Sequence, residues 1–129
     1  MAETILDELE AQAKALHESA NALAARLLDE GLRRERHPLI YFRLGGSGQR
    51  RPALVGTRLY IWQIISTLRG SKDIADAADY LGLTEPQVRA AVAYYADYTD
   101  EVDAYAAEEE EFARRERERW EREQQVLGA

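Results

Sequence analysis

The chain contains no cysteine among its 129 residues, and this absence excludes several kinds of site. Without cysteine there is no disulfide framework, no zinc site built from thiolates and no cysteine nucleophile. No apolar run approaches the length of a membrane span, and no segment has the pattern of a signal peptide. We therefore expect a cytoplasmic protein of one compact domain with extensions, without a membrane partner.

Patterns that would hold a cofactor or perform catalysis are also missing. The glycine-rich segment 45–48 is followed by no P-loop lysine, and it lacks the GxGxxG spacing. His17 and His37 stand far apart, and neither has neighbours that would complete a metal site. Acidic residues are numerous, but they occur in runs that are typical of solvated helix surfaces. We expect no catalytic residue, no metal, no cofactor and no enzymatic activity.

The net charge of −7 is distributed in blocks of opposite sign. Residues 31–72 carry nine bases and one acid, whereas residues 73–111 carry twelve acids and one base. A basic segment beside acidic helices is typical of a chain that binds a polyanion. The same pattern arises when a basic segment neutralises the acidic helices of its own chain. Both interpretations stay open on composition alone.

Residues 2–31 have the apolar spacing of one long amphipathic helix. Leucine and alanine recur at intervals of three and four residues, in the a and d positions of heptads. These positions are Leu6, Leu9, Ala13, Leu16, Ala20, Leu23 and Leu27. We predict a helix that ends at Gly31 and self-associates through Leu9, Leu16 and Leu23. Alternatively the stripe covers the chain's own domain, because the pattern is short for an independent coiled coil.

A small β element is predicted after residue 38. Residues 39–44 are β-branched and aromatic, as is typical of a short strand. A flexible glycine-rich turn is expected over 45–52, and a second strand over 53–60.

Residues 55–95 predict a helix-turn-helix, with helices over 61–69, 72–81 and 85–97. Ser71 is the expected N-cap of the second helix, and Gly82 can end that helix in a left-handed conformation. Thr84 is a good N-cap for the third helix, and Gln87 three residues later completes a capping box. We expect the third helix to bury Val88, Ala91, Val92 and Tyr95.

A final charged helix is predicted from Thr99, its N-cap, to about residue 126. Glutamate and arginine recur four residues apart along it, and its apolar residues are sparse. Such a polar helix stands in solvent or docks through a few anchors. Tyr105, Phe112 and Trp120 are the candidate contacts with a protein partner.

Together these segments predict a mainly α fold: a small helix-turn-helix core with a short N-terminal β element, flanked by long N- and C-terminal helices. The expected organisation is an amphipathic helix over 1–31, the core domain over 37–103 and the charged helix over 104–129.

Two motifs in the core domain are similar to those of a known family. One is P-x-x-x-G-T-R-L at 52–59, and the other is L-T-x-x-Q-V-x-A-A-x-x-Y-Y at 83–95. They resemble a small bacterial family, long catalogued as a domain of unknown function, whose members often carry the name VapB-type antitoxin. Over about residues 37–103 the resemblance implies a β element before a helix-turn-helix core, and a homodimer. It also implies binding of a PIN-type ribonuclease toxin and repression of the protein's own operon. The long helices before residue 37 and after residue 103 are departures from that family.

Candidate DNA contacts combine basic residues upstream of the helix-turn-helix with polar residues inside it. The helix over 72–81 carries three aspartates, which makes it a poor surface for a polyanion. We therefore expect the upstream arginines to supply most of the attraction. The candidates are Arg50, Arg51, Arg58, Lys72, Thr84, Gln87 and Arg89.

Two functions are compatible with these features. The first is an antitoxin-like, DNA-binding transcriptional regulator that also binds and neutralises a PIN-type ribonuclease toxin. The alternative is a non-catalytic protein–protein interaction or assembly module, whose helix-turn-helix does not bind DNA.

Overall fold

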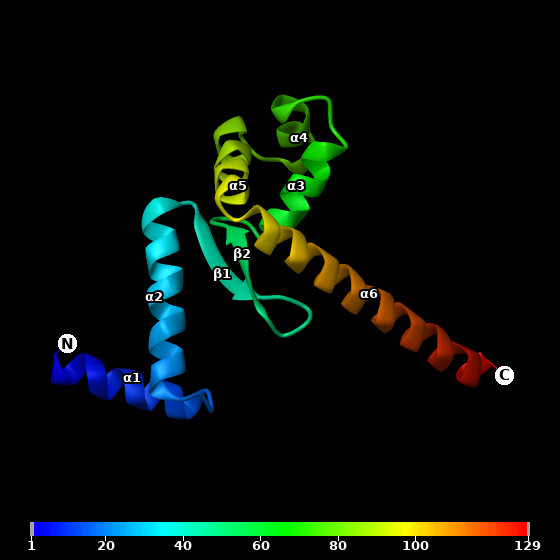
Figure 1. Cartoon of the computed structure of the whole chain (residues 1–129). Coiled ribbons are helices and arrows are strands. Elements are labelled where there is room, and N and C mark those ends of the chain that lie inside the picture. The colour runs from blue at the N-terminus through cyan, green and yellow to red at the C-terminus, as the bar shows by residue number, and fades with distance from the viewer. Residues whose placement is uncertain (1, 129) are drawn as a thin grey trace. The chain divides into compact units, whose positions relative to one another are not determined.

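The computed structural model describes residues 2–128, which form six helices and one two-stranded sheet (Figure 1). The predicted fold class, mainly helical with a small β element and a long C-terminal helix, is confirmed. The chain divides into two compact units, Met1–Pro38 and Leu39–Ala129.

The first unit contains two helices where the sequence predicts one. Helix α1 spans Glu3–Ala15 and helix α2 spans Ala20–Arg36. Between them His17 has a φ of 56°, and the Ser19 hydroxyl caps α2 by accepting from the Ala22 amide at 3.1 Å. The single-helix prediction over 2–31 is therefore wrong, because a serine cap starts a new helix inside the heptad pattern. The predicted end at Gly31 is also wrong, since α2 continues to Arg36.

Helices α1 and α2 contact each other, and Ala13 and Leu23 are the buried apolar residues of this unit. Glu18 in the connecting turn accepts from Arg26 of α2 at 3.0 Å. Of the predicted self-association residues, Leu23 is buried, Leu9 is half-buried and Leu16 is exposed. Leu23 therefore serves the unit itself.

The second unit begins with an antiparallel hairpin. Strand β1 spans Ile40–Leu44 and strand β2 spans Arg50–Leu54, with Ile40 opposite Leu54 and Leu44 opposite Arg50. The second strand was predicted over 53–60, so both its start and its end lie earlier in the chain than expected. The turn needs only residues 45–49, and Pro52 is tolerated because a two-stranded sheet consists of edge strands.

Three helices follow the hairpin close to their predicted positions. They are α3 over Ile61–Arg69, α4 over Ile74–Leu81 and α5 over Glu85–Asp97. The predicted cap of α4 at Ser71 is wrong, because the Ser71 hydroxyl donates to the Thr67 carbonyl of α3 at 2.7 Å. Asp73 takes its place and accepts from the Asp76 amide at 2.9 Å.

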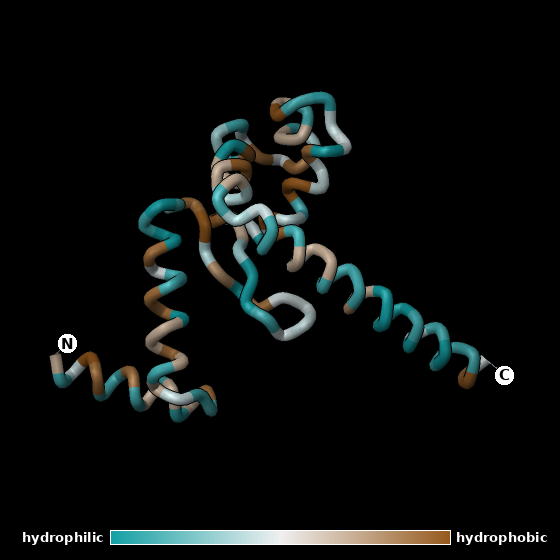
Figure 2. The backbone as a smooth tube through the Cα atoms, in the orientation of Figure 1, coloured by the Kyte–Doolittle hydropathy of each residue, from teal (hydrophilic) through white to brown (hydrophobic). Residues whose placement is uncertain are grey.

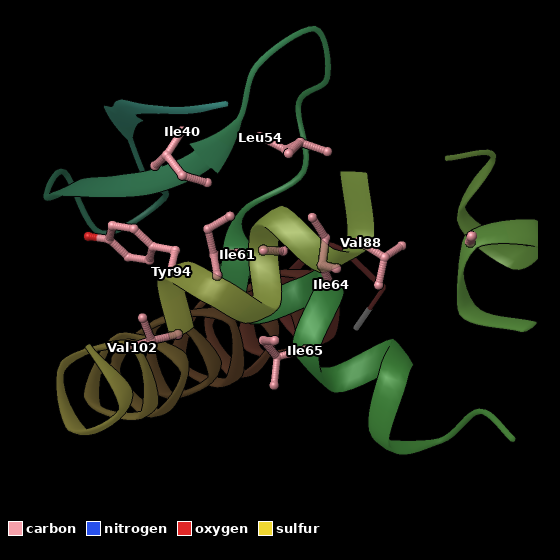
Figure 3. Close-up of a cluster of buried hydrophobic side chains, with 10 residues drawn as sticks. Ile40, Leu54, Ile61, Ile64, Ile65, Val88, Tyr94 and Val102 are labelled. Atoms are coloured by element: carbon pink, nitrogen blue, oxygen red, sulfur yellow. The ribbon is translucent and has the colours of Figure 1, made fainter. Parts of the chain in front are cut away.

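One hydrophobic core joins the hairpin to α3, α5 and the last helix (Figure 3). Its largest fully buried apolar residues are Ile40, Leu54, Ile61, Ile64, Val88, Tyr94 and Val102. Tyr94, rather than the predicted Tyr95, is the buried tyrosine of α5, and its ring lies edge-on to Phe42 with centroids 6.4 Å apart. Ala91 is buried as predicted, whereas Val92 is half-buried.

Helix α6 spans Thr99–Gly128 and confirms the predicted charged helix. It is continuous through the expected domain boundary at 103–104, so the helix belongs to the core at one end. Val102 and Glu109 are its buried residues. Beyond them the helix leaves the core and is mostly hydrophilic (Figures 1 and 2).

Candidate functional site

The turn between α4 and α5 has the geometry that the sequence predicts. Gly82 ends α4 with a φ of 70°, in the left-handed region that favours glycine. The Thr84 hydroxyl accepts from the Gln87 amide at 3.3 Å, and Gln87 Oε1 accepts from the Thr84 amide at 2.8 Å. Both side chains, predicted as DNA contacts, therefore hold the start of α5. A base or phosphate would compete with the cap for them.

The charges around the helix-turn-helix are mostly negative. Asp73 caps α4, and Asp76 accepts from the Lys72 amide at 3.0 Å. Arg89 Nη2 lies 3.8 Å from Glu85 Oε1, and 65% of the Arg89 side chain is exposed. Exposed carboxylates at these positions repel a phosphate backbone, so α5 alone is a weak reading element.

Three further arginines lie on or next to the hairpin. Arg43 lies over the Tyr60 ring at 4.6 Å and donates to the Arg58 carbonyl at 2.6 Å. Arg50 donates to the Phe42 carbonyl at 3.2 Å. The Arg58 side chain is exposed, so Arg58 and Lys72 are predicted contacts with exposed charge.

Arg51 does not fit its predicted role as a DNA contact. Only 4% of the residue is exposed, and its Nε lies 3.3 Å from Glu109 Oε1 on α6. A second bond joins its guanidinium to Glu108, and the group lies over the Tyr105 ring at 4.2 Å. A buried cation needs such partners, because desolvation of the charge is costly. The charge of Arg51 is thus neutralised inside the protein.

The turn of the hairpin also fits closely against α6. The Ser47 hydroxyl donates to Glu109 Oε1 at 2.8 Å. A Cβ on Gly45 would lie 2.5 Å from the same oxygen, and a Cβ on Gly46 would lie 3.3 Å from the Phe112 ring. A Cβ at 45 therefore fits only if the turn or the Glu109 carboxylate shifts. Sequence reasoning missed this contact, although the acidic run 108–111 and the basic hairpin were its visible signals.

A second set of contacts fixes the start of α6. The Tyr95 hydroxyl donates to Asp103 Oδ1 at 2.8 Å, and Arg69 of α3 bonds the same hydroxyl. The hydrogen bond to Asp103 is the main cause that raises the pKa of Tyr95 above its ordinary value. Tyr95 thus links α3, α5 and α6 near the surface of the core.

The last sixteen described positions of α6, residues 113–128, are helical and every side chain is exposed. We call this segment the α6 arm. Ion pairs support its first part: Arg114 bonds Glu111 and Glu118, Arg115 bonds Glu111, and Arg119 bonds Glu116. The Arg114 bond chiefly holds the pKa of the Glu111 carboxyl below its ordinary value. These pairs support a helix that has no core of its own.

The predicted partner contacts differ in their surroundings. Tyr105 is half-buried beneath Arg51 and donates to Glu101 at 2.6 Å, so it belongs to the docking of the hairpin. Phe112 is 37% exposed at the point where the arm begins. Trp120 is 60% exposed, well beyond the core.

Within residues 2–128, no cluster of three or more His, Asp or Glu side chains is suited to hold a metal ion. In the same part of the chain, none of the helices is both long enough and apolar enough to span a bilayer.

Residues 48–95 match the model of a protein family described as a protein of unknown function, DUF433. The matched segment covers less than half of the 129 residues, from the end of the hairpin turn to Tyr95 on α5. No curated protein and no solved structure matched the chain.

The DUF433-like segment holds Arg51 but not its partners on α6. Glu108, Glu109 and the whole α6 arm lie outside it, as does the α1–α2 unit. No activity is assigned to this family. The resemblance to VapB-type antitoxins therefore stays a prediction, and any function must be argued from the geometry.

Proposed function

We propose that this protein is a non-enzymatic, antitoxin-like transcriptional regulator that binds DNA and also binds and neutralises a PIN-type ribonuclease toxin. The observation that carries the proposal is the α6 arm, which stays helical over residues 113–128 although all of its side chains are exposed. A helix that contributes nothing to its own core is suited to occupy a groove on a partner.

The apolar anchors of the arm share one face. Trp120 and Leu127 are 60% and 78% exposed, and they lie one heptad apart. Paired charges of both signs precede Trp120, where Arg114 pairs with Glu118 and Arg119 pairs with Glu116. The matching groove on a ribonuclease would be apolar at its centre and polar at its rim. Binding there would cover the enzyme's surface and block access of RNA.

For DNA, support comes from the tight α4–α5 turn and from the basic block 31–72. The turn joins two consecutive helices, which is the order of elements in helix-turn-helix proteins. Arg58 and Lys72 are exposed and lie outside α5, in the segments that precede α3 and α4. DNA contact would therefore depend mainly on phosphate attraction from these flanking residues.

The DNA proposal is tested by fluorescence anisotropy with a labelled duplex taken from the region upstream of the protein's own reading frame. We expect sequence-specific binding that weakens at least about tenfold between 50 and 200 mM salt. The double variant R58A/K72A should weaken it further. The matched control is R117A/R119A, which removes two arm charges and should leave DNA affinity unchanged. Absence of binding at 50 mM salt overturns the DNA role.

The partner proposal is tested with the full chain, the chain truncated after Ala113 and the double variant W120A/L127A. We expect calorimetric binding of a PIN-type ribonuclease encoded beside this protein, with inhibition of its RNA cleavage, for the full chain only. Val126 is as exposed as Leu127 but lies on another face, so V126A is the matched control. Unchanged inhibition by the truncated chain contradicts the assignment of the arm.

A second function is an interaction or assembly module that binds no nucleic acid. It is supported by four predicted DNA contacts whose side chains already bind other residues of the protein. These are Arg51 with Glu109, Thr84 with Gln87, and Arg89 with Glu85. Retained partner binding together with a negative DNA titration would select this alternative.

A further inference from the structure

The α1–α2 unit leaves most of its large apolar side chains exposed. Only Ala13 and Leu23 are buried among the apolar residues that the structure describes in this unit. Six large ones are between 42% and 66% exposed: Ile5, Leu6, Leu16, Leu27, Leu28 and Leu32. Monomeric proteins rarely expose a contiguous apolar patch of more than a few hundred Å². This unit therefore presents an interaction surface.

Its size leads to the same conclusion. A unit of Met1–Pro38 is at the limit below which a chain needs disulfides, a metal or oligomerisation to hold a fold. The protein has no cysteine, and residues 2–128 contain no cluster of metal ligands. Association with another molecule is a route that would stabilise a unit of this size.

The apolar face of α2 is centred on an unusual glycine. Leu27, Leu28, Gly31 and Leu32 lie on neighbouring positions of two consecutive turns, and we call them the α2 face. A Cβ on Gly31 would meet nothing within 4 Å. Glycine inside a helix costs about 1 kcal/mol relative to alanine, and no contact within the single chain requires glycine at this position. Glycine does allow the backbone of another helix to approach closely.

The surroundings of Gly31 fit such an approach. A shallow hollow beside it is lined by Arg34, Glu35 and Pro38, so the surface around the glycine is open to an approaching helix. Arg33, Arg34 and Arg36 make the end of α2 basic, whereas α1 carries four acids and one base. The first helix is thus acidic and the last turn of α2 is basic, with Glu35 as the acid within that turn and Asp29 and Glu30 one turn earlier on α2. A two-fold arrangement would place α1 of each copy beside the basic end of the other copy's α2.

We propose that the α2 face is a self-association surface, covered by the α1–α2 unit of a second copy of this chain. The second copy is the partner that supplies the apolar surface, the opposite charges and the small residue at once. This assigns self-association to Leu27, Leu28 and Leu32 around Gly31, whereas the sequence pattern pointed to Leu9, Leu16 and Leu23. The proposal does not depend on DNA or ribonuclease binding.

The experiment is sedimentation equilibrium of the full chain between about 1 and 100 µM. This range brackets a dimer dissociation constant of about 10 µM. We expect twice the chain mass of 14.7 kDa for the natural sequence and a single chain mass for L28E/L32E. V126E/L127E makes the same change on exposed residues of the α6 arm and should keep the doubled mass. L28A/L32A keeps good helix formers at both positions and should weaken the dimer at least tenfold.

Unfolding of the second unit is separated from loss of the dimer by spectroscopy, and L28A/L32A, which keeps good helix formers, is the control for the first unit. Residues 1–38 contain no Trp, Tyr or Phe, so near-ultraviolet circular dichroism and tryptophan fluorescence report the second unit alone. We expect these signals to be unchanged in every variant. A single chain mass for the natural sequence at 100 µM overturns the proposal. A doubled mass retained by both L28E/L32E and L28A/L32A also overturns it, because the copies then meet elsewhere.

G31A tests the close approach. In a lone chain alanine stabilises α2, so the substitution should be neutral or favourable. At a close helix crossing the added methyl weakens association, and we expect the dissociation constant to rise at least tenfold. An unchanged or tighter dimer contradicts the crossing at Gly31.

Discussion

Arg51 Nε on β2 lies 3.3 Å from Glu109 Oε1 on α6, and both residues are at least nine-tenths buried. The pair joins two elements far apart in the sequence, and the Ser47 hydroxyl bonds the same carboxylate. It holds α6 against the hairpin as far as Phe112. The position of the α6 arm therefore depends on an ion pair that the DUF433-like segment supplies only in part.

The variant R51M removes the guanidinium but keeps most of the apolar stem. We expect the free energy of unfolding to fall by about 3 kcal/mol, because Glu109 is left as a buried charge without its cation. Urea unfolding followed by near-ultraviolet circular dichroism measures the change. R58M removes an exposed arginine and should shift stability by no more than about 0.5 kcal/mol. Equal effects of the two variants would contradict the role of the buried pair.

The substitution G45A tests the fit of the hairpin turn against α6. The new Cβ would lie 2.5 Å from Glu109 Oε1, so the turn or the carboxylate must move. We expect a loss of about 1–3 kcal/mol in unfolding free energy, in the range of other overpacked sites. In G70A the Cβ meets its nearest atom at 3.7 Å, and this variant is the control. A thermal melt in which G45A is as stable as G70A would refute the close contact.

Because of Tyr95, we expect the stability of the protein to fall as the pH rises above about 10. Its pKa is raised in the folded protein, chiefly because the hydroxyl donates to Asp103. The neutral form is therefore favoured by folding: its contribution is full below the ordinary tyrosine pKa of about 10 and is lost as pH rises through the higher folded pKa. We expect Y95F to lose less stability than the natural sequence between pH 9 and pH 11, which are about one unit either side of that value. Parallel urea midpoints for both proteins across this range would contradict the prediction.

Two truncations separate the arm from the docked part of α6. Removal of the residues after Ala113 takes away only exposed side chains, so we expect stability to change by less than about 0.5 kcal/mol. Removal of the residues after Asp103 also takes away Tyr105, Glu108 and Glu109, so Arg51 loses the ring that covers it and both of its counter-ions. That deletion should cost about 3 kcal/mol or more. Urea unfolding of the two truncated chains and the full chain measures both changes, and equal midpoints for the two truncations would contradict the prediction.

Local signals in the sequence predicted the second unit well. The boundaries of α5 follow from Gly82, Thr84 and Gln87, whose chemistry acts within a few residues, and these caps form as expected. The start of β2 was misplaced because strand pairing depends on how β1 and β2 meet. In the first unit the heptad pattern was read across His17–Ser19, although a serine can start a new helix there.

The candidate site was harder to predict than the fold. Arg51, Glu108, Glu109 and Tyr105 are brought together only by packing, and none of them has a local motif. Charge blocks suggested that the basic segment could meet the acidic helices, and for Arg51 that interpretation holds. Exposure of the α6 arm, in contrast, follows from its composition, because too few apolar residues recur to form a buried face.

Because α6 is one unbroken helix from the core to residue 128, its length fixes the distance between the core and a partner bound at its far end. Each residue inserted between Phe112 and Trp120 would move that anchor by about 1.5 Å and turn it by about 100° around the helix axis. A single insertion would thus aim Trp120 at a different side of the molecule, whereas an insertion of seven would nearly restore its direction about 10 Å farther out. The number of residues in the arm therefore sets both the distance of a bound partner from the core and its orientation around the helix axis.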